Sequence, residues 1–272
     1  MKLRIALFCL LGGLSFTIPA LGVGNFGWWW LSGVITAAVL VPVARYGPRG
    51  LWAQFGSIFC VLIVVGMGCT FSEGVVFFPE TKANLYTAVP GATTMYLIAA
   101  AVLMVLVKVL KLTNSGAPKV AIRPAAVAGP MMLASAASYV VYYLIFGAIV
   151  FQLFTKQYYP HAAEQVAAMG LWFWGYQLAR GLLMTLAVVP IIYTLRLPRW
   201  QAALAVGLLV WVVGGAAPLV VPSTMMVAQQ RYLHIMEIFT QNFSLGVTAV
   251  LLLRPGAAKL QAAAHTAYTP AV

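Results

Sequence analysis

The feature that most constrains this sequence is a series of apolar runs, each long enough to cross a lipid bilayer. Eight runs can be marked, at about residues 3–22, 28–45, 51–70, 93–111, 127–154, 166–195, 201–221 and 232–253. A helix of roughly 20 apolar residues spans the hydrocarbon core, where every backbone polar group must be hydrogen-bonded within the protein. The sequence therefore predicts an all-α polytopic membrane protein of about eight transmembrane helices, with residues 1–254 forming a single integral membrane domain.

The composition excludes a soluble domain and points to the lipid bilayer as the main partner. Charged residues are 7% of the 272 residues, against roughly 25% in soluble domains. The net charge of +12 comes from cations dispersed at the ends of the runs, which argues against a nucleic-acid partner. Cys9, Cys60 and Cys69 lack CxxC spacing, so no disulfide framework or thiolate metal site is indicated. We expect residues 255–272, which are rich in alanine, to form a disordered cytoplasmic tail.

The loops alternate in positive charge, and this alternation predicts an orientation. If the N-terminus is cytoplasmic, the outer loops receive Lys82, Lys156 and Arg231. The cytoplasmic side then receives Lys2, Arg4, Arg45, Arg49, Lys108, Lys111, Lys119, Arg123, Arg196, Arg199, Arg254 and Lys259. Because Lys and Arg accumulate in cytoplasmic loops, we expect a bacterial inner (plasma) membrane protein with both termini in the cytoplasm. The opening MKLRIALFCLLGGLSFTIPALG also has the pattern of a signal peptide, whose cleavage would leave seven spans.

Two pairs of short motifs raise the hypothesis of an internal repeat. RYGPRGLW (45–52) and RLPRW (196–200) lie four spans apart, as do FPET (78–81) and VPST (221–224). An even offset implies parallel halves, so the hypothesis is a parallel 4+4 repeat. The alternative is that cytoplasmic loops are generally rich in arginine, proline and tryptophan.

The last apolar run is unusually polar where it begins, in RYLHIMEIFTQNFSLG (residues 231–246). On a helix its polar side chains occupy one arc of about 140–160°, opposite Phe239 and Phe243. The members of this polar seam are Arg231, His234, Glu237, Gln241, Asn242 and Ser244. The seam is predicted to descend from the outer surface toward the middle of the membrane.

The sixth run supplies a companion face that contains Tyr176, Gln177 and Arg180. At about 1.5 Å per residue, Arg180 would lie roughly 16 Å deep, level with the amides of Gln241 and Asn242. A charge at that depth is costly and needs a partner, for which the candidates are Glu237, these amides and a bound anion. The prediction is an outward-open pocket between spans six and eight, lined by Tyr176, Gln177, Arg180, Arg231, His234, Glu237, Gln241 and Asn242. The alternative is a purely structural tie between the two spans.

Two His-x-x-Glu pairs raise the question of a metal cofactor. Residues three apart share a helix face, so each pair could give one imidazole and one carboxylate to an ion. The candidate ligands are His161, Glu164, His234 and Glu237, to which Glu73 or Glu80 would add a further carboxylate. Such a nitrogen and oxygen shell suits zinc, manganese or iron. The alternative is that the glutamates simply favour the first turn of a helix.

The segment FSEGVVFFPETKANLYTAVPG (71–91) connects the third and fourth runs and is itself largely apolar. We expect it to fold back onto the outer membrane surface, or to cover the mouth of the polar seam as a lid.

Three functions fit these patterns. The first is a permease or binding protein for a small anionic or zwitterionic ligand, in which Arg180 attracts the negative group and Glu237 or His234 carries a proton. The second is an intramembrane enzyme, with or without a metal, that acts on a lipid headgroup through His234 and Glu237. The third is a structural subunit of a larger membrane complex or of a homo-oligomer.

Overall fold

The computed structural model describes residues 1–22, 24–77, 82, 84–114, 120, 123–159 and 161–255. Regular structure within these ranges is helical throughout, without strands. Seven of the described helices are long and apolar enough to cross a membrane, and they span Phe26–Tyr46, Leu51–Phe77, Leu85–Val109, Ala125–Tyr158, Leu171–Thr194, Arg199–Val220 and Ala228–Leu253. They indicate a multi-pass membrane protein, in agreement with the all-α prediction.

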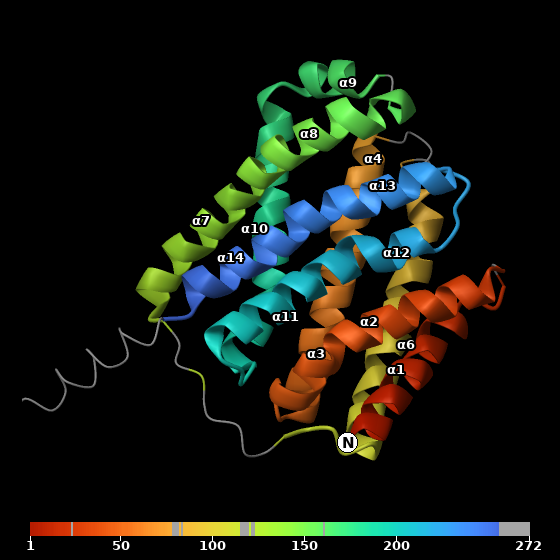
Figure 1. The fold of residues 1–272 in the computed structure, drawn as a ribbon, viewed down its shortest axis with the longest axis vertical. Coiled ribbons are helices and arrows are strands. Elements are labelled where there is room, and N and C mark those ends of the chain that lie inside the picture. The colour runs from red at the N-terminus through yellow and green to blue at the C-terminus, as the bar shows by residue number, and fades with distance from the viewer. Residues whose placement is uncertain are drawn as a thin grey trace, which may run out of the picture.

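Several of these helices contain segments of different winding (Figure 1). The α-helical elements are α1 (Lys2–Thr17), α2 (Phe26–Tyr46), α3 (Leu51–Val61), α4 (Thr70–Phe77), α6 (Leu85–Val109), α7 (Ala125–Tyr142), α8 (Ala148–Val150), α9 (Ala162–Met169), α10 (Leu171–Thr194), α11 (Arg199–Trp211), α12 (Ala217–Val220), α13 (Ala228–Ile238) and α14 (Ser244–Leu253). Wider π-helical segments join them, namely η1 (Leu62–Cys69), η2 (Tyr143–Gly147), η3 (Phe151–Thr155), η5 (Val212–Ala216) and η6 (Phe239–Phe243), and η4 (Lys156–Tyr158) is a 3₁₀ turn. Such π-helical turns are common at functional sites.

The first predicted span is shorter in the structure than in the sequence prediction. Helix α1 has 16 residues, and at about 1.5 Å per residue it is roughly 24 Å long. It packs closely against α2, since a Cβ added at Gly33 would lie 2.8 Å from the Cα of Gly13. The count of eight spans therefore stays a prediction.

Two helices begin or end at other residues than predicted, and these differences determine which side chains reach the site. The chain stays helical through α4 to Phe77, so the first part of the expected lid extends the third span and carries Glu73 within it. The rest of that segment includes residues 78–81 and 83, which lie outside the described residues. The predicted sixth span divides at Gly170, whose φ of +54° favours glycine, into α9 and α10. Helix α9 then lies across the end of the bundle near α8 (Figure 1).

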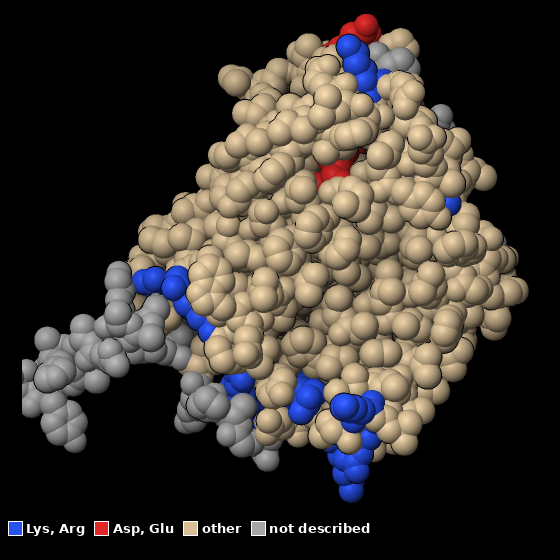
Figure 2. Space-filling model, in the orientation of Figure 1, with Lys and Arg blue, Asp and Glu red and all other residues tan. Residues whose placement is uncertain are grey.

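Lysine and arginine gather mainly at one end of the molecule, which we call the cationic end (Figure 2). Several arginines there donate hydrogen bonds to backbone carbonyls at the C-terminal ends of helices from other parts of the chain. The guanidinium of Arg254 bonds the carbonyl oxygens of Ile192 (Nε, 2.7 Å), Leu197 (Nη1, 3.0 Å) and Leu195. Because the last carbonyls of a helix have no partner within it, these arginines act as C-terminal caps.

The two loops with similar Arg/Pro motifs are in contact at this end. Arg196 donates to the carbonyl oxygen of Gly47 at 2.6 Å, and its backbone N–H donates to that of Tyr46 at 2.8 Å. This contact gives Arg196 a structural role that does not require an internal repeat. The 4+4 repeat stays a prediction. The FPET motif and residues 256–272, which hold most of the predicted tail, lie outside the described residues.

We predict that Arg254→Met lowers the apparent melting temperature of the purified protein by roughly 5 °C, because a charged group that bonds three carbonyls contributes about 2 kcal/mol. Arg4→Met is the matched control, since Arg4 is exposed on α1. Thermal unfolding in detergent measures both variants. Equal melting temperatures for the two would contradict the capping role.

Candidate functional site

The strongest polar contact among the described residues joins Arg180 to Glu73. Arg180 lies in the middle of α10 and Glu73 in α4, and Nη2 of the arginine is 2.5 Å from Oε2 of the glutamate. Their side chains are 2% and 12% exposed, respectively. An ion pair with so little access to water is screened weakly, and either partner alone would be an uncompensated buried charge.

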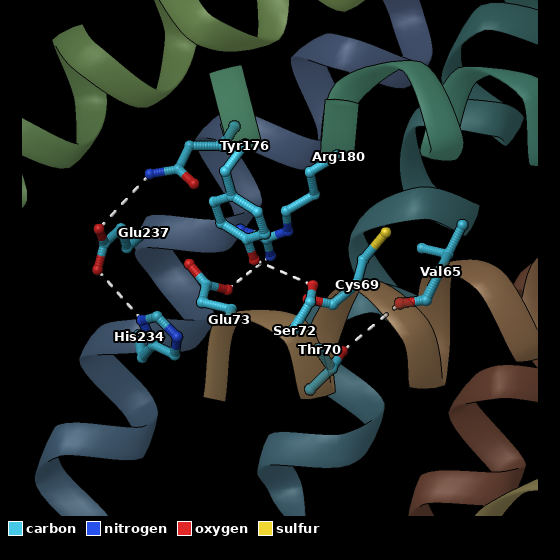
Figure 3. A network of polar contacts seen from close by, with 10 residues as sticks. Val65, Cys69, Thr70, Ser72, Glu73, Tyr176, Arg180, His234 and Glu237 are labelled. Carbon is cyan, nitrogen blue, oxygen red and sulfur yellow. Dashed lines mark hydrogen bonds and ion pairs between the residues drawn. The ribbon is translucent and has the colours of Figure 1, made fainter. Parts of the chain in front are cut away.

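Aromatic side chains surround this pair. Tyr176 lies one helical turn before Arg180 on α10, and its hydroxyl donates to Ser72 Oγ at 3.0 Å, next to the ion pair (Figure 3). The guanidinium carbon of Arg180 lies 5.7 Å from the ring centroid of Tyr139, a cation–π distance. Helices α4, α7 and α10 are therefore tied together around one arginine.

A second polar group lies on the last membrane-crossing helix. His234 Nδ1 and Glu237 Oε2 on α13 are 3.2 Å apart, and Gln241 Nε2 reaches Glu237 Oε1 at 3.5 Å. In Figure 3, Glu73 lies between this His–Glu pair and Arg180. Because Glu73 lies beside both, the two groups form one cluster of charged and polar side chains (Figure 3).

A cavity of about 420 Å³ lies beside the cluster. Its ionisable groups are Glu73, His234 and Glu237. Its aromatic wall is formed by Phe77, Tyr143, Phe151, Tyr159, Phe173 and Trp174, and α9 adds small side chains above. Burial raises the pKa of the Tyr159 phenol, which therefore stays neutral. The cavity is thus an apolar, aromatic space with carboxylates on one side.

The cavity lies near the side of the bundle. The helices run close to the plane of view in Figure 1, so the face drawn in Figure 2 is a lateral face. Acidic atoms are visible in a hollow of that face, in the region where α8 and α13 lie (Figure 2). Glu73 and Glu237 keep 12% and 13% of their side chains exposed. Lateral faces of membrane proteins contact lipid, so the position allows access from that side.

The predicted partner of Arg180 was wrong. The candidates were Glu237, the amides of Gln241 and Asn242, and an anion, whereas the structure places Glu73 on the guanidinium. The physical reason is that α4 continues the third span far enough to bring Glu73 alongside α10. The pocket accordingly lies among spans three, five, six and eight, and not between six and eight alone.

The other predicted lining residues divide between two places. His234 and Glu237 line the cavity, while Tyr176, Gln177, Gln241 and Asn242 lie around it or deeper in the bundle. Arg231 points elsewhere, because its Nη1 donates to the carbonyl oxygens of Leu219 (3.1 Å) and Val220 (3.3 Å) at the end of α12. It therefore caps α12, and its role in ligand binding stays a prediction of the sequence.

The two His-x-x-Glu pairs do not meet. His161 and Glu164 contact each other at 3.3 Å with side chains 74% and 80% exposed, and neither lines the cavity. Within the described part of the chain, no group of three or more His, Cys, Asp or Glu side chains could hold a metal ion. Glu80, a candidate further ligand, lies outside the described residues. A transition metal therefore stays a sequence hypothesis without a described ligand set.

Two parts of the site were not predicted from the sequence. Glu73 was expected in a loop, although the apolar residues Val75–Phe77 after it were a signal that the helix continues. The fifth span was given no role, although residues 143–155 form much of the cavity wall. That part of the span is mostly apolar and aromatic and has no charged residue before Lys156, so no charge pattern marked it.

Comparisons with models of protein families, with curated proteins and with solved structures found no match to this chain.

We predict that Glu73→Gln and Arg180→Met each lower the free energy of unfolding by about 3 kcal/mol, because each leaves one buried charge without its partner. The double variant is expected to lose clearly less than the sum of the two single losses. Chemical unfolding of the four proteins in detergent completes the double-mutant cycle. Additive losses would show that the two side chains do not interact.

Proposed function

We propose that this protein binds an amphipathic molecule with a positively charged head, which it takes up from the lipid side into the cavity beside Glu237. The observation that carries the proposal is the Arg180–Glu73 contact at 2.5 Å. It removes Arg180 as a free cation for an anionic ligand and leaves the cavity with carboxylates as its charged groups.

The charges that line the cavity support a cationic ligand. Glu73 is neutralised by Arg180, so the remaining ionisable groups of the cavity are Glu237 and His234. With His234 neutral, Glu237 gives the cavity one negative charge, which a cationic head could match. With His234 protonated, the pair is neutral and that attraction is lost. Protonation of His234 would therefore compete with the binding of a cationic ligand beside Glu237.

The walls of the cavity support an amphipathic ligand. Aromatic faces attract cations as well as apolar groups, and six aromatic side chains line the space. A volume of about 420 Å³ is within the range of small-molecule sites. An opening on the lateral face would let such a molecule arrive with its tail in lipid.

Among the described residues, the half of α10 beyond Thr185 buries apolar side chains and gives no continuous polar path to the cationic end. Beyond Arg180, α10 buries Met184, Val188, Ile191 and Ile192, all between 0% and 1% exposed. A bound molecule therefore has no route between these side chains, which favours a binding protein over an open channel. A permease would need a second conformation.

We also propose that the protein lies in a bacterial inner membrane with its cationic end in the cytoplasm. The concentration of lysine and arginine at one end of the bundle supports this orientation (Figure 2). A role in a larger complex or a homo-oligomer stays a prediction of the sequence.

Two probes of the same shape and opposite charge test the ligand class. We predict that the purified protein in detergent binds tetraphenylphosphonium at least about tenfold more tightly than tetraphenylborate, a difference of roughly 1.4 kcal/mol. Equilibrium dialysis measures both. Tighter binding of the borate would contradict the proposal and favour the anionic ligand predicted from sequence.

The exposed copy of the His–Glu pair provides a matched control. Glu237→Gln is expected to weaken tetraphenylphosphonium binding about tenfold or more, because it removes the free carboxylate of the cavity. Glu164 also pairs with a histidine three residues before it, but its side chain is exposed and does not line the cavity, so Glu164→Gln is the matched substitution. It is expected to leave binding unchanged. Equal effects of the two substitutions would show that the probe does not bind at Glu237.

A lipid-modifying enzyme is the second candidate, favoured by the proximity of the His234–Glu237 pair to an opening on the lateral face. A histidine held by a carboxylate is suited to accept and donate protons. Incubation with phospholipid vesicles, followed by mass spectrometry of the lipids, separates the candidates. An enzyme yields a new product that His234→Gln abolishes, whereas a binding protein returns its lipids unchanged.

A further inference from the structure

Beneath the cavity, several deeply buried polar side chains have atoms without hydrogen-bond partners among the described residues. Gln177 on α10 is 0% exposed and Asn242 on η6 is 1% exposed, and both amide groups are unpartnered. The same holds for the hydroxyl of Tyr139 on α7, and for Nε and Nη1 of Arg180. We call Tyr139, Gln177, Arg180 and Asn242 the buried polar layer.

Close contacts connect this layer into one region. Arg180 lies over the ring of Tyr139, and Gln177 is three residues before Arg180 on the same face of α10. Helices η5 and η1 approach each other closely beside Asn242, since a Cβ added at Gly214 would lie 2.8 Å from Asn242 Nδ2 and 2.9 Å from Val65 Cγ1. Val65 is one turn before Cys69 on η1, and Cys69 lies near Arg180 (Figure 3).

The layer is also continuous with the cavity. The ring of Tyr139 lies 6.2 Å from that of Tyr143, and Tyr143 lines the cavity. On the other side, Gln241 precedes Asn242 on η6 and reaches Glu237, also a cavity residue. About one helical turn further toward the cationic end, α7 and α10 are joined by the hydrogen bond between Ser135 and Thr185, 3.0 Å long.

The unpartnered atoms include donors and acceptors in one place. The guanidinium nitrogens of Arg180 only donate, the two amides each donate and accept, and the Tyr139 hydroxyl does both. A small anion would satisfy the donors and leave the oxygens of Gln177 and Asn242 without partners. A small cation would satisfy those oxygens but would be repelled by Arg180. Water, which donates and accepts, satisfies all of them.

We propose that the buried polar layer is a water-binding site, in which ordered waters extend the cavity into the centre of the bundle and end at Ser135 and Thr185. A buried polar group without a hydrogen-bond partner destabilises the folded protein, so bound waters that satisfy these groups stabilise the layer. They also hydrate the side of Arg180 that faces away from Glu73. The inference does not depend on the ligand class proposed for the cavity.

Radiolytic hydroxyl labelling tests this site, because hydroxyl radicals formed from nearby bound water oxidise side chains that bulk solvent does not reach. The protein is exposed to a short X-ray pulse in lipid nanodiscs, and peptides are quantified by mass spectrometry. We expect Tyr139 to be labelled at least about fivefold faster than Phe8, although both are 0% exposed, because waters collect at polar sites and not in apolar cores. Phe8 belongs to the apolar core and is the internal reference.

Two variants sharpen the test. Gln177→Leu is expected to reduce the labelling of Tyr139 severalfold by removing two of the groups that hold water, while Gln165→Leu on α9, outside the layer, leaves it unchanged. Labelling of wild-type Tyr139 at the level of Phe8 would overturn the proposal regardless of how the variants fold. Unchanged labelling of Tyr139 in Gln177→Leu would show that the buried polar layer does not hold the water, and would overturn the proposal.

Discussion

The ion pair between Arg180 and Glu73 is the interaction on which the rest of this site depends. A guanidinium in the middle of an apolar helix must find a compensating charge, and Glu73 supplies it from α4. To do so, the membrane-crossing helix that begins at Leu51 continues to Phe77, past the point where its apolar run is interrupted by Ser72 and Glu73. The contact therefore fixes the length of one helix and the position of another.

Pairing Arg180 with Glu73 also determines what the neighbouring cavity can attract. With the arginine neutralised, the charge that faces the aromatic wall belongs to Glu237, held by His234 and Gln241. A carboxylate among aromatic faces suits a cationic or proton-carrying group, whereas a free arginine would have suited an anion. In the function that we propose, the charge of the ligand thus follows from which of two glutamates lies against the arginine, and not from the composition of the site.

The sequence was sufficient for the fold class because hydropathy reports directly on helices that cross a bilayer. It also identified His234, Glu237 and Arg180 as neighbours of one site, from helical spacing alone. It could not identify Glu73 as the partner, because three acidic residues besides Glu237 competed and the choice depends on where α4 ends. It could not show that Arg231 caps α12, since helix spacing places a side chain on a face but does not say which backbone carbonyls it reaches.

In the proposed function, Glu73 neutralises Arg180 and Glu237 is left to bind a cation. An electron cryo-microscopy map of the protein in lipid nanodiscs with tetraphenylphosphonium, at a resolution that defines side chains, shows both contacts at once. We expect Arg180 in contact with Glu73 and probe density between the aromatic wall and Glu237. A map in which Arg180 turns into the cavity, apart from Glu73, or in which the cavity is closed by protein side chains, would contradict it.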